Sequence, residues 1–124
     1  NLGLTKEQAM LLVLRASDLG EKDDSKEAVR LGLIETPENW QEKITREEFA
    51  SAMAKAYLLN NGEIIEGNAG YVDENEISKE FYEGVMLLSA LDVIKGGEDG
   101  AFYPKKNLTR AEAATIIERF FEIG

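Results

Sequence analysis

Apolar residues recur with helical spacing in three stretches of the chain. Counted from Thr5, Thr45 and Thr109, the fourth, fifth, eighth and eleventh residues are apolar in every stretch. Residues at these offsets share one face of an α-helix. They are Ala9, Met10, Val13 and Ala16, then Phe49, Ala50, Met53 and Ala56, then Ala113, Ala114, Ile117 and Phe120. The pattern predicts three helices that pack on one another and form the centre of one all-α domain.

The three predicted helices begin with the same signature. Each threonine is followed three residues later by a side chain that can cap the helix start, namely Gln8, Glu48 and Glu112. The residue before each threonine is apolar, as is the fourth residue after it, which is typical of a hydrophobic staple. The preceding residues are Leu4, Ile44 and Leu108. These matched starts indicate three related units.

A cation directly follows each threonine, as Lys6, Arg46 and Arg110. This position normally favours an acid, because the first turn of a helix carries partial positive charge. One interpretation is an anion bound jointly by the cation and the free N-terminal amides. The other is a solvated charge that pairs with an acid of a neighbouring unit. The sequence leaves the two interpretations open.

The segments between these helices are less regular. A polar turn is expected over 20–24, a short helix over 25–33 and a loop over 34–43, in which Trp40 is more simply a plug for the core than a platform for a ligand. Residues 60–70 are the most linker-like part. An amphipathic helix is predicted over 78–91, and the glycines that follow, Gly96 and Gly97, can take left-handed backbone angles.

Composition narrows the chemistry. A chain of 124 residues is long enough for one domain, and its net charge of −10 argues against nucleic acid as a partner. Without cysteine or histidine it lacks thiol catalysis, most zinc sites and a Ser-His-Asp triad. The longest apolar run, 9–14, is too short to span a membrane. We expect no cofactor, no metal ion and no membrane insertion.

The sequence contains no pattern typical of an enzyme. A glycosidase needs two carboxylates across a cleft, and nothing in the spacing of Asp73 and Asp99 singles out such a pair. A calcium-binding loop beginning at Asp73 would have Ser78 where a glycine is needed and Gly84 where a bidentate glutamate is needed. We therefore expect no catalytic residues and no metal ligands.

The second half of the chain resembles an S-layer homology repeat. The marks are Tyr71-Val72-Asp73, a glycine and Asp-Gly turn before Phe102-Tyr103-Pro104, and the ending Thr109-Arg110-Ala111-Glu112. By this resemblance the chain is one domain with a partial repeat over 1–20, a degenerate repeat over 21–62 and a complete repeat over 71–124. The implied fold is an all-α, pseudo-threefold arrangement of helix-loop-helix repeats around a central three-helix bundle.

The resemblance also implies a function. Family members anchor bacterial surface proteins by binding an acidic, often pyruvylated, secondary cell-wall polysaccharide, which implies an extracellular location at the cell wall or S-layer. Their motif arginine contacts the sugar carboxylate, a role that falls here on Arg110 and Arg46, whereas Lys6 lacks the planar fork of arginine. Gly96 and Gly97 match a loop that lets a sugar approach the backbone. Two further candidates for polysaccharide binding are Asp73 and Trp40.

A second function stays open at this point. The half-repeat at the start and the altered loop around Trp40 fit a degenerate module that has lost sugar binding and packs against other domains of a larger surface protein. We expect Arg110 to contribute most to polysaccharide binding, because it belongs to the complete repeat and because Gly96 and Gly97 are expected beside it.

Overall fold

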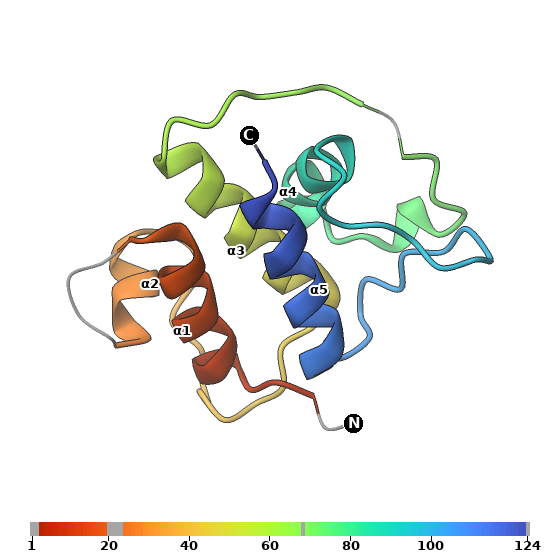
Figure 1. Cartoon of the computed structure of the whole chain (residues 1–124). Coiled ribbons are helices and arrows are strands. Elements are labelled where there is room, and N and C mark those ends of the chain that lie inside the picture. The colour runs from red at the N-terminus through yellow and green to blue at the C-terminus, as the bar shows by residue number, and fades with distance from the viewer. Residues whose placement is uncertain (1–2, 20–23, 68, 124) are drawn as a thin grey trace.

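The computed structural model describes residues 3–19, 24–67 and 69–123, and within them the protein is built of helices (Figure 1). The described residues form no strand or sheet, which confirms the predicted all-α class. The elements are α1 (Lys6–Ser17), α2 (Lys26–Arg30), α3 (Arg46–Leu59), the 3₁₀ turn η1 (Glu74–Glu76), α4 (Lys79–Ala90) and α5 (Arg110–Phe121). Most of the expected polar turn, 20–23, and position 68 of the expected linker lie outside the described residues.

Three helices, α1, α3 and α5, begin with the predicted capping boxes, and we call them the closing helices. In each box the threonine hydroxyl accepts from the third amide of the helix, and the threonine amide donates back to the side chain of that third residue. The return bonds are similar in length, 3.0 Å from Thr5 to Gln8 and 2.9 Å in both other boxes. The predicted helix starts are therefore confirmed.

The residues just before the three capping threonines form a closed ring of backbone hydrogen bonds. Leu4 N–H donates to Leu108 O at 3.0 Å, Leu108 N–H donates to Ile44 O at 3.0 Å, and Ile44 N–H donates to Leu4 O at 2.9 Å. All three side chains are fully buried. The apolar residue expected to staple each helix thus also joins the three units to one another.

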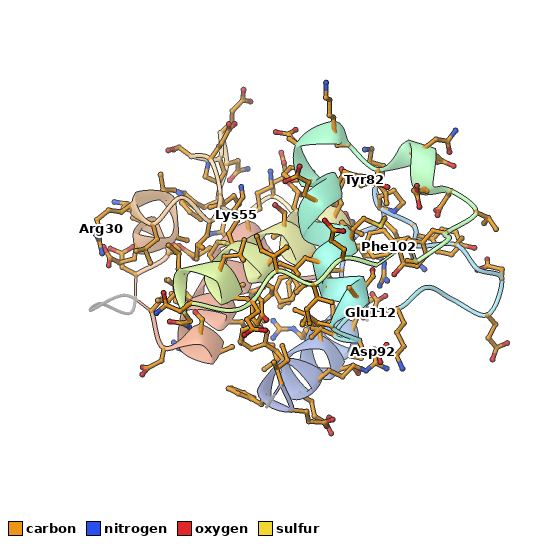
Figure 2. All side chains as sticks on the ribbon, turned by 90° about the horizontal axis from the view of Figure 1, so that it is seen from above. Arg30, Lys55, Tyr82, Asp92, Phe102 and Glu112 are labelled. Atoms are coloured by element: carbon orange, nitrogen blue, oxygen red, sulfur yellow. The ribbon has the colours of Figure 1, made fainter. Side chains whose placement is uncertain are left out.

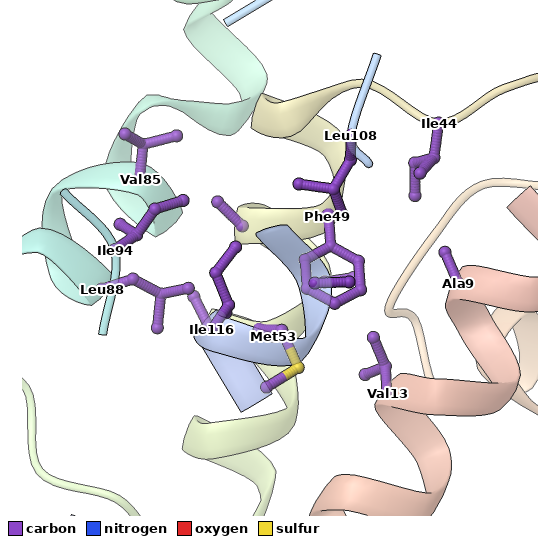
Figure 3. Close-up of a cluster of buried hydrophobic side chains, with 14 of the residues drawn as sticks. Ala9, Val13, Ile44, Phe49, Met53, Val85, Leu88, Ile94, Leu108 and Ile116 are labelled. Carbon is purple, nitrogen blue, oxygen red and sulfur yellow. The ribbon is translucent and has the colours of Figure 1, made fainter. Parts of the chain in front are cut away.

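Helix α3 lies at the centre of the core. Phe49 and Met53 are fully buried and lie between α1, α4 and α5 (Figure 3), where they meet Val13, Leu88 and Ile116. The alanines of α3 are buried with them, since small side chains let neighbouring helices approach closely. The apolar stripe predicted for α3 is confirmed at every position.

Helices α2 and α4, which we call the opening helices, cover the closing helices of the preceding units. Helix α2 packs on α1 and α4 packs on α3 (Figure 1), whereas no opening helix in the described chain packs on α5. The stripe predicted for α5 is therefore wrong in part. Ala114 is exposed and Ile117 is only half-buried, while Ile116 is buried in their place, because no opening helix of the described chain covers that side of α5.

Two features near α4 differ from expectation. The helix ends at Ala90, and the left-handed residue that follows is Asp92, with φ of 61°, whereas Gly96 and Gly97 do not take the left-handed angles expected of them. At the other end, the buried carboxylate of Glu47 accepts from the amide and the hydroxyl of Ser78, both at 2.8 Å. A side chain from α3 thus caps the start of α4.

Candidate functional site

The cation Lys6 at the start of α1 is neutralised by the unit that follows it. Its Nζ lies 2.6 Å from Glu42 Oε1 and 3.5 Å from Glu48 Oε2. Burial alone lowers the pKa of Lys6, but the hydrogen bond to Glu42 and the charge of Glu48 outweigh burial and raise that pKa above its ordinary value. Lys6 is therefore a charged partner of two acids within the molecule.

Arg46 at the start of α3 is buried more completely and makes more contacts. Its Nε donates to Phe102 O at 2.8 Å, its Nη1 pairs with Glu112, and its guanidinium lies 5.0 Å from the centre of the Phe102 ring. Only 8% of the residue is exposed. These bonds fix α3 to the loop before α5, so Arg46 joins the second unit to the third.

Arg110 at the start of α5 is different, because it is exposed and takes part in none of the ion pairs among the described residues. Lys6 and Arg46 each meet the capping-box glutamate of the next unit, Glu48 or Glu112. In the first unit the capping residue is Gln8, whose amide carries no charge. Arg110 accordingly has no matching carboxylate.

The backbone amides at the helix starts also have partners. Lys6 N–H donates to Glu42 O at 2.8 Å, and the matching amide of Arg46 donates to Lys106 O at 2.9 Å. The next amides, of Glu7 and Glu47, likewise donate to carbonyls of the following loops. The amides beside Lys6 and Arg46 are therefore already bonded within the chain, which favours the interpretation of a cation that pairs with an acid of a neighbouring unit. Among the three closing helices, within the described residues, α5 alone begins with two amides that lack such an acceptor.

A groove of about 300 Å³ lies where α3 and α5 meet the loop after α4, and we call it the Arg46 groove. Its wall contains the backbone of Gly96 and four charged side chains, namely Arg46, Lys95, Glu112 and Arg119. Figure 2 shows Phe102 and Glu112 on this side of the molecule, away from Arg30 of α2. Three of the charged residues are cations, so the groove is positive although the chain as a whole is strongly acidic.

Glu112 is held in its charged form within this groove. Burial favours the neutral acid, but hydrogen bonds from Thr109 and the charge of Arg46 outweigh burial, so the pKa of Glu112 lies below its ordinary value. One of its oxygens accepts from the Thr109 amide and the other pairs with Arg46. The capping box thus supplies the counter-charge of Arg46.

A corresponding groove of about 460 Å³ lies between α1 and the loop after α2, and we call it the Lys6 groove. Lys6 and Lys55 take the places that Arg46 and Arg119 take in the Arg46 groove, one and ten residues after the capping threonine. Its charge is nevertheless reversed. Its wall carries two lysines and five glutamates, which are Glu35, Glu38, Glu42, Glu48 and Glu80.

A third hollow, of about 540 Å³, lies along α5 and we call it the Arg110 hollow. It is mostly apolar and includes Leu12, Ile117 and Phe121, the last with 66% of its surface exposed. The sequence placed the loop of Gly96 and Gly97 beside Arg110. That expectation is wrong, because the units follow one another around the ring and the loop lies beside the arginine of the preceding unit, Arg46.

The remaining predicted site residues have structural contacts. Asp73 accepts from the amides of Phe102 and Tyr103, at 2.8 and 2.9 Å, and so holds the two ends of the third unit together. Trp40 packs against the core, as the simpler interpretation expected. Any side chain at Gly96 would collide with Ala101 O and the Tyr71 ring, both 2.9 Å from the added carbon, so packing also requires this glycine.

Sequence reasoning missed Arg119 and Lys95 as residues of the site. A signal for Arg119 was present, because Arg15, Lys55 and Arg119 all lie ten residues after a capping threonine. No repeat of this kind marks Lys95, whose counterpart in the second unit is Glu35. Its place in the groove follows from the path of the loop after α4.

Residues 70–114 match the S-layer homology domain family. This segment of the chain is similar to an S-layer homology domain. The matched segment runs from just before η1 into α5 and supplies Lys95, Gly96 and Glu112 of the Arg46 groove, while α3 before it supplies Arg46. This groove therefore lies between the matched segment and the preceding unit.

Several curated proteins are similar to the chain. An endoglucanase of Bacillus sp. (strain KSM-635) is 36% identical over 78 residues, which cover 61% of the chain and 8% of that protein. A surface layer protein of Brevibacillus choshinensis is 36% identical over 78 residues, covering 61% and 7%. An amylopullulanase of Thermoanaerobacterium thermosulfurigenes is 35% identical over 83 residues, covering 65% and 4%. The chain thus spans less than a tenth of each of these relatives.

None of the helices in the described ranges combines the length and the apolar character that a membrane crossing needs.

Proposed function

We propose that the chain is a cell-wall anchoring module that binds an acidic secondary cell-wall polysaccharide in the Arg46 groove. The observation that carries the proposal is a positive groove, built partly by the segment that matches the S-layer homology family, in a chain with a net charge of −10. A pyruvate ketal on the sugar is the carboxylate that such a groove would hold by charge-assisted hydrogen bonds. We further propose an extracellular location, at the bacterial cell wall or S-layer.

The similar proteins support anchoring over catalysis. Two of them are named as enzymes with different activities and one as a surface layer protein, yet all three share a segment of similar length with this chain. A segment common to such different proteins is not tied to one reaction. We therefore propose that the module itself catalyses nothing and holds other parts of a longer protein at the wall.

The predicted site residues enter this proposal with unequal roles. Arg46 and Gly96 form the wall of the binding groove, and Gly97 continues the same loop. Arg110 is a separate, exposed cation that can meet a second acidic group of the polymer. Lys6 contributes least, because two glutamates already neutralise it. Asp73 and Trp40 act by holding the loops in place.

The test is a pull-down of the chain on purified wall polysaccharide, before and after chemical removal of pyruvate. We expect retention on the intact polymer and loss of retention after the treatment. A chain that fails to bind the intact polymer would contradict the proposed function. Equal retention on both polymers would contradict the carboxylate as the recognised group, while leaving the wall as the partner.

A second candidate function is a packing module that has lost sugar binding. It is favoured by the internal ion pairs of Lys6 and Arg46 and by the apolar Arg110 hollow with its exposed Phe121. The same pull-down separates the two functions. A packing module would ignore the polysaccharide in every form, and its Phe121→Ser variant would lose affinity for a neighbouring domain of the parent protein.

A further inference from the structure

We propose that the anionic group of the polysaccharide is held by Arg119 and Lys95, at one site per chain, and that Arg46 positions the groove without being the main contact. This inference rests on the proposed function, because it assigns the residues that recognise the acid. It also assigns the Lys6 groove as a site that rejects anions.

Arg46 has little capacity left for a ligand. Its Nε and Nη2 donate to carbonyls of the loop after α4, its Nη1 pairs with Glu112, and one ring face of Phe102 covers its guanidinium. An incoming carboxylate would have to compete with Glu112, whose negative charge is fixed by the capping box. The contacts of Arg46 instead set the distance between α3, the loop and α5, and hence the shape of the groove.

Arg119 and Lys95 supply charge that the protein itself does not neutralise. Both line the Arg46 groove, and neither belongs to an ion pair within the described part of the chain. Arg119 is half-buried on α5, which holds its guanidinium against the groove, whereas Lys95 is exposed on the loop. Once the pair of Arg46 and Glu112 is discounted, these two cations leave the groove with positive charge.

The Lys6 groove provides an internal comparison. It has the same architecture, and Lys55 lies at the position that corresponds to Arg119. Glu35 replaces Lys95, and Glu38 and Glu80 add further negative charge to the wall. An anionic sugar in this groove would meet like charges at close range, which disfavours its binding. The two grooves therefore share one architecture, and their opposite charges decide which of them accepts an anionic ligand.

The experiment compares Arg119→Gln with Lys55→Gln, which removes the same charge from the corresponding position of the other groove. Both variants and the wild type are titrated calorimetrically with a pyruvylated wall fragment and with the same fragment after removal of pyruvate. Loss of one charge-assisted hydrogen bond weakens binding about ten- to hundredfold. We expect that loss for Arg119→Gln, no change for Lys55→Gln, and one bound fragment per chain in the wild type.

Two further variants distinguish a loss of binding from a loss of folding. Lys95→Gln changes an exposed loop residue, so it should weaken binding without affecting folding, and it replaces Arg119→Gln as the test if thermal unfolding shows that the latter is destabilised. Arg119→Lys keeps the charge and should recover part of the affinity. A merely structural role of Arg119 would not produce this recovery together with an unchanged melting temperature.

The outcomes separate this inference from the function on which it rests. If the wild type binds but Arg119→Gln and Lys95→Gln bind equally well, the assignment of the two cations is overturned while anchoring stands. A stoichiometry of two fragments, or a loss caused by Lys55→Gln, would overturn the rejection of anions by the Lys6 groove. If the wild type does not bind the pyruvylated fragment, the proposed recognition itself fails.

Discussion

The capping-box glutamates of this fold serve two groups at once. One oxygen of Glu112 accepts from the Thr109 amide, and the other pairs with Arg46 of the preceding unit. Glu48 repeats the arrangement with Lys6. The oxygen of Gln8 accepts from the Thr5 amide, but its side-chain nitrogen is a donor and cannot pair with a cation as a second carboxylate oxygen does. The difference between glutamine and glutamate at one helix position thus decides which cation stays free.

Removal of Arg46 should therefore destabilise the fold much more than removal of Arg110. Arg46→Ala loses bonds to Phe102 O and Glu112, and we expect it to lower the free energy of unfolding by about 1.5–3 kcal/mol. Arg110→Ala removes an exposed residue without an ion pair, and should change it by less than about 0.5 kcal/mol. Urea unfolding of both variants measures the difference. Equal stabilities would contradict the structural role of Arg46.

Glu112 should make the free energy of unfolding depend on pH, in a direction that follows from its lowered pKa. Its pKa is lower in the folded than in the unfolded chain, so its contribution is fully present above the ordinary glutamate range and is lost as the pH falls through the folded value. Glu112→Gln keeps the cap, as Gln8 does, but loses the ion pair. We expect the wild type to be more stable than the variant at pH 7, and this difference in stability to shrink towards pH 3. The difference should be small, because 32% of the Glu112 side chain is exposed and solvent screens the ion pair.

The measurement is the denaturation midpoint of both proteins at several pH values. Thr115→Ala serves as a control, because it changes the same helix without touching Glu112 or its hydrogen-bond partners. An advantage of the wild type that stays constant from pH 7 to pH 3 would contradict the ionic contribution of Glu112.

At the scale of single helices, stability depends on the cap at the helix start and on the face that is buried. Thr109→Ala should lower the free energy of unfolding by about 0.5–2 kcal/mol, since the third amide of α5 loses its acceptor. Urea unfolding tests this directly, with Thr115→Ala as a matched change in the same helix that does not touch the cap. A cost no larger than that of Thr115→Ala would mean that the cap contributes nothing.

Because α3 is covered by an opening helix and α5 is not, a charge introduced on α3 should affect folding more than one introduced on α5. Met53→Asp places a carboxylate in the middle of the core and should unfold the chain, because a buried unpaired charge is not tolerated. Ile117→Asp faces the Arg110 hollow and should leave a folded protein. Circular dichroism during heating distinguishes the two. Loss of the cooperative transition in both variants would show that α5 is buried on that side as well.

The sequence predicts the elements well where local chemistry decides them. The three capping boxes and the stripe of α3 depend on residues three to eleven positions apart, and all of these are found as expected. The stripe of α5 fails because burial of Ile117 depends on whether another helix covers it. The cap of α4 by Glu47 was not predictable either, since its partner Ser78 comes from a distant segment.

The site depends on the order of the units around the whole molecule. Sequence motifs identified the cations and the loop of Gly96, but paired that loop with Arg110 because the two lie in one repeat. The ring places each loop beside the cation of the preceding unit, so the correct partner is Arg46. Repeat matching within the chain finds equivalent residues. It does not reveal that one groove is positive and the other acidic, which follows from scattered substitutions in the loops.

The ring of Leu4, Ile44 and Leu108 has a consequence for the order of events during folding. Helical proteins usually fold quickly because their contacts are local, but this ring joins residues close to both ends of the chain and can form only after two long loops have closed. We expect stopped-flow refolding to be slower than is typical of helical bundles, and Leu108→Ala to slow it further, because that contact belongs to the step that limits the rate. During synthesis on the ribosome, the ring next to α1 and α3 therefore cannot close until Leu108 has been added to the chain.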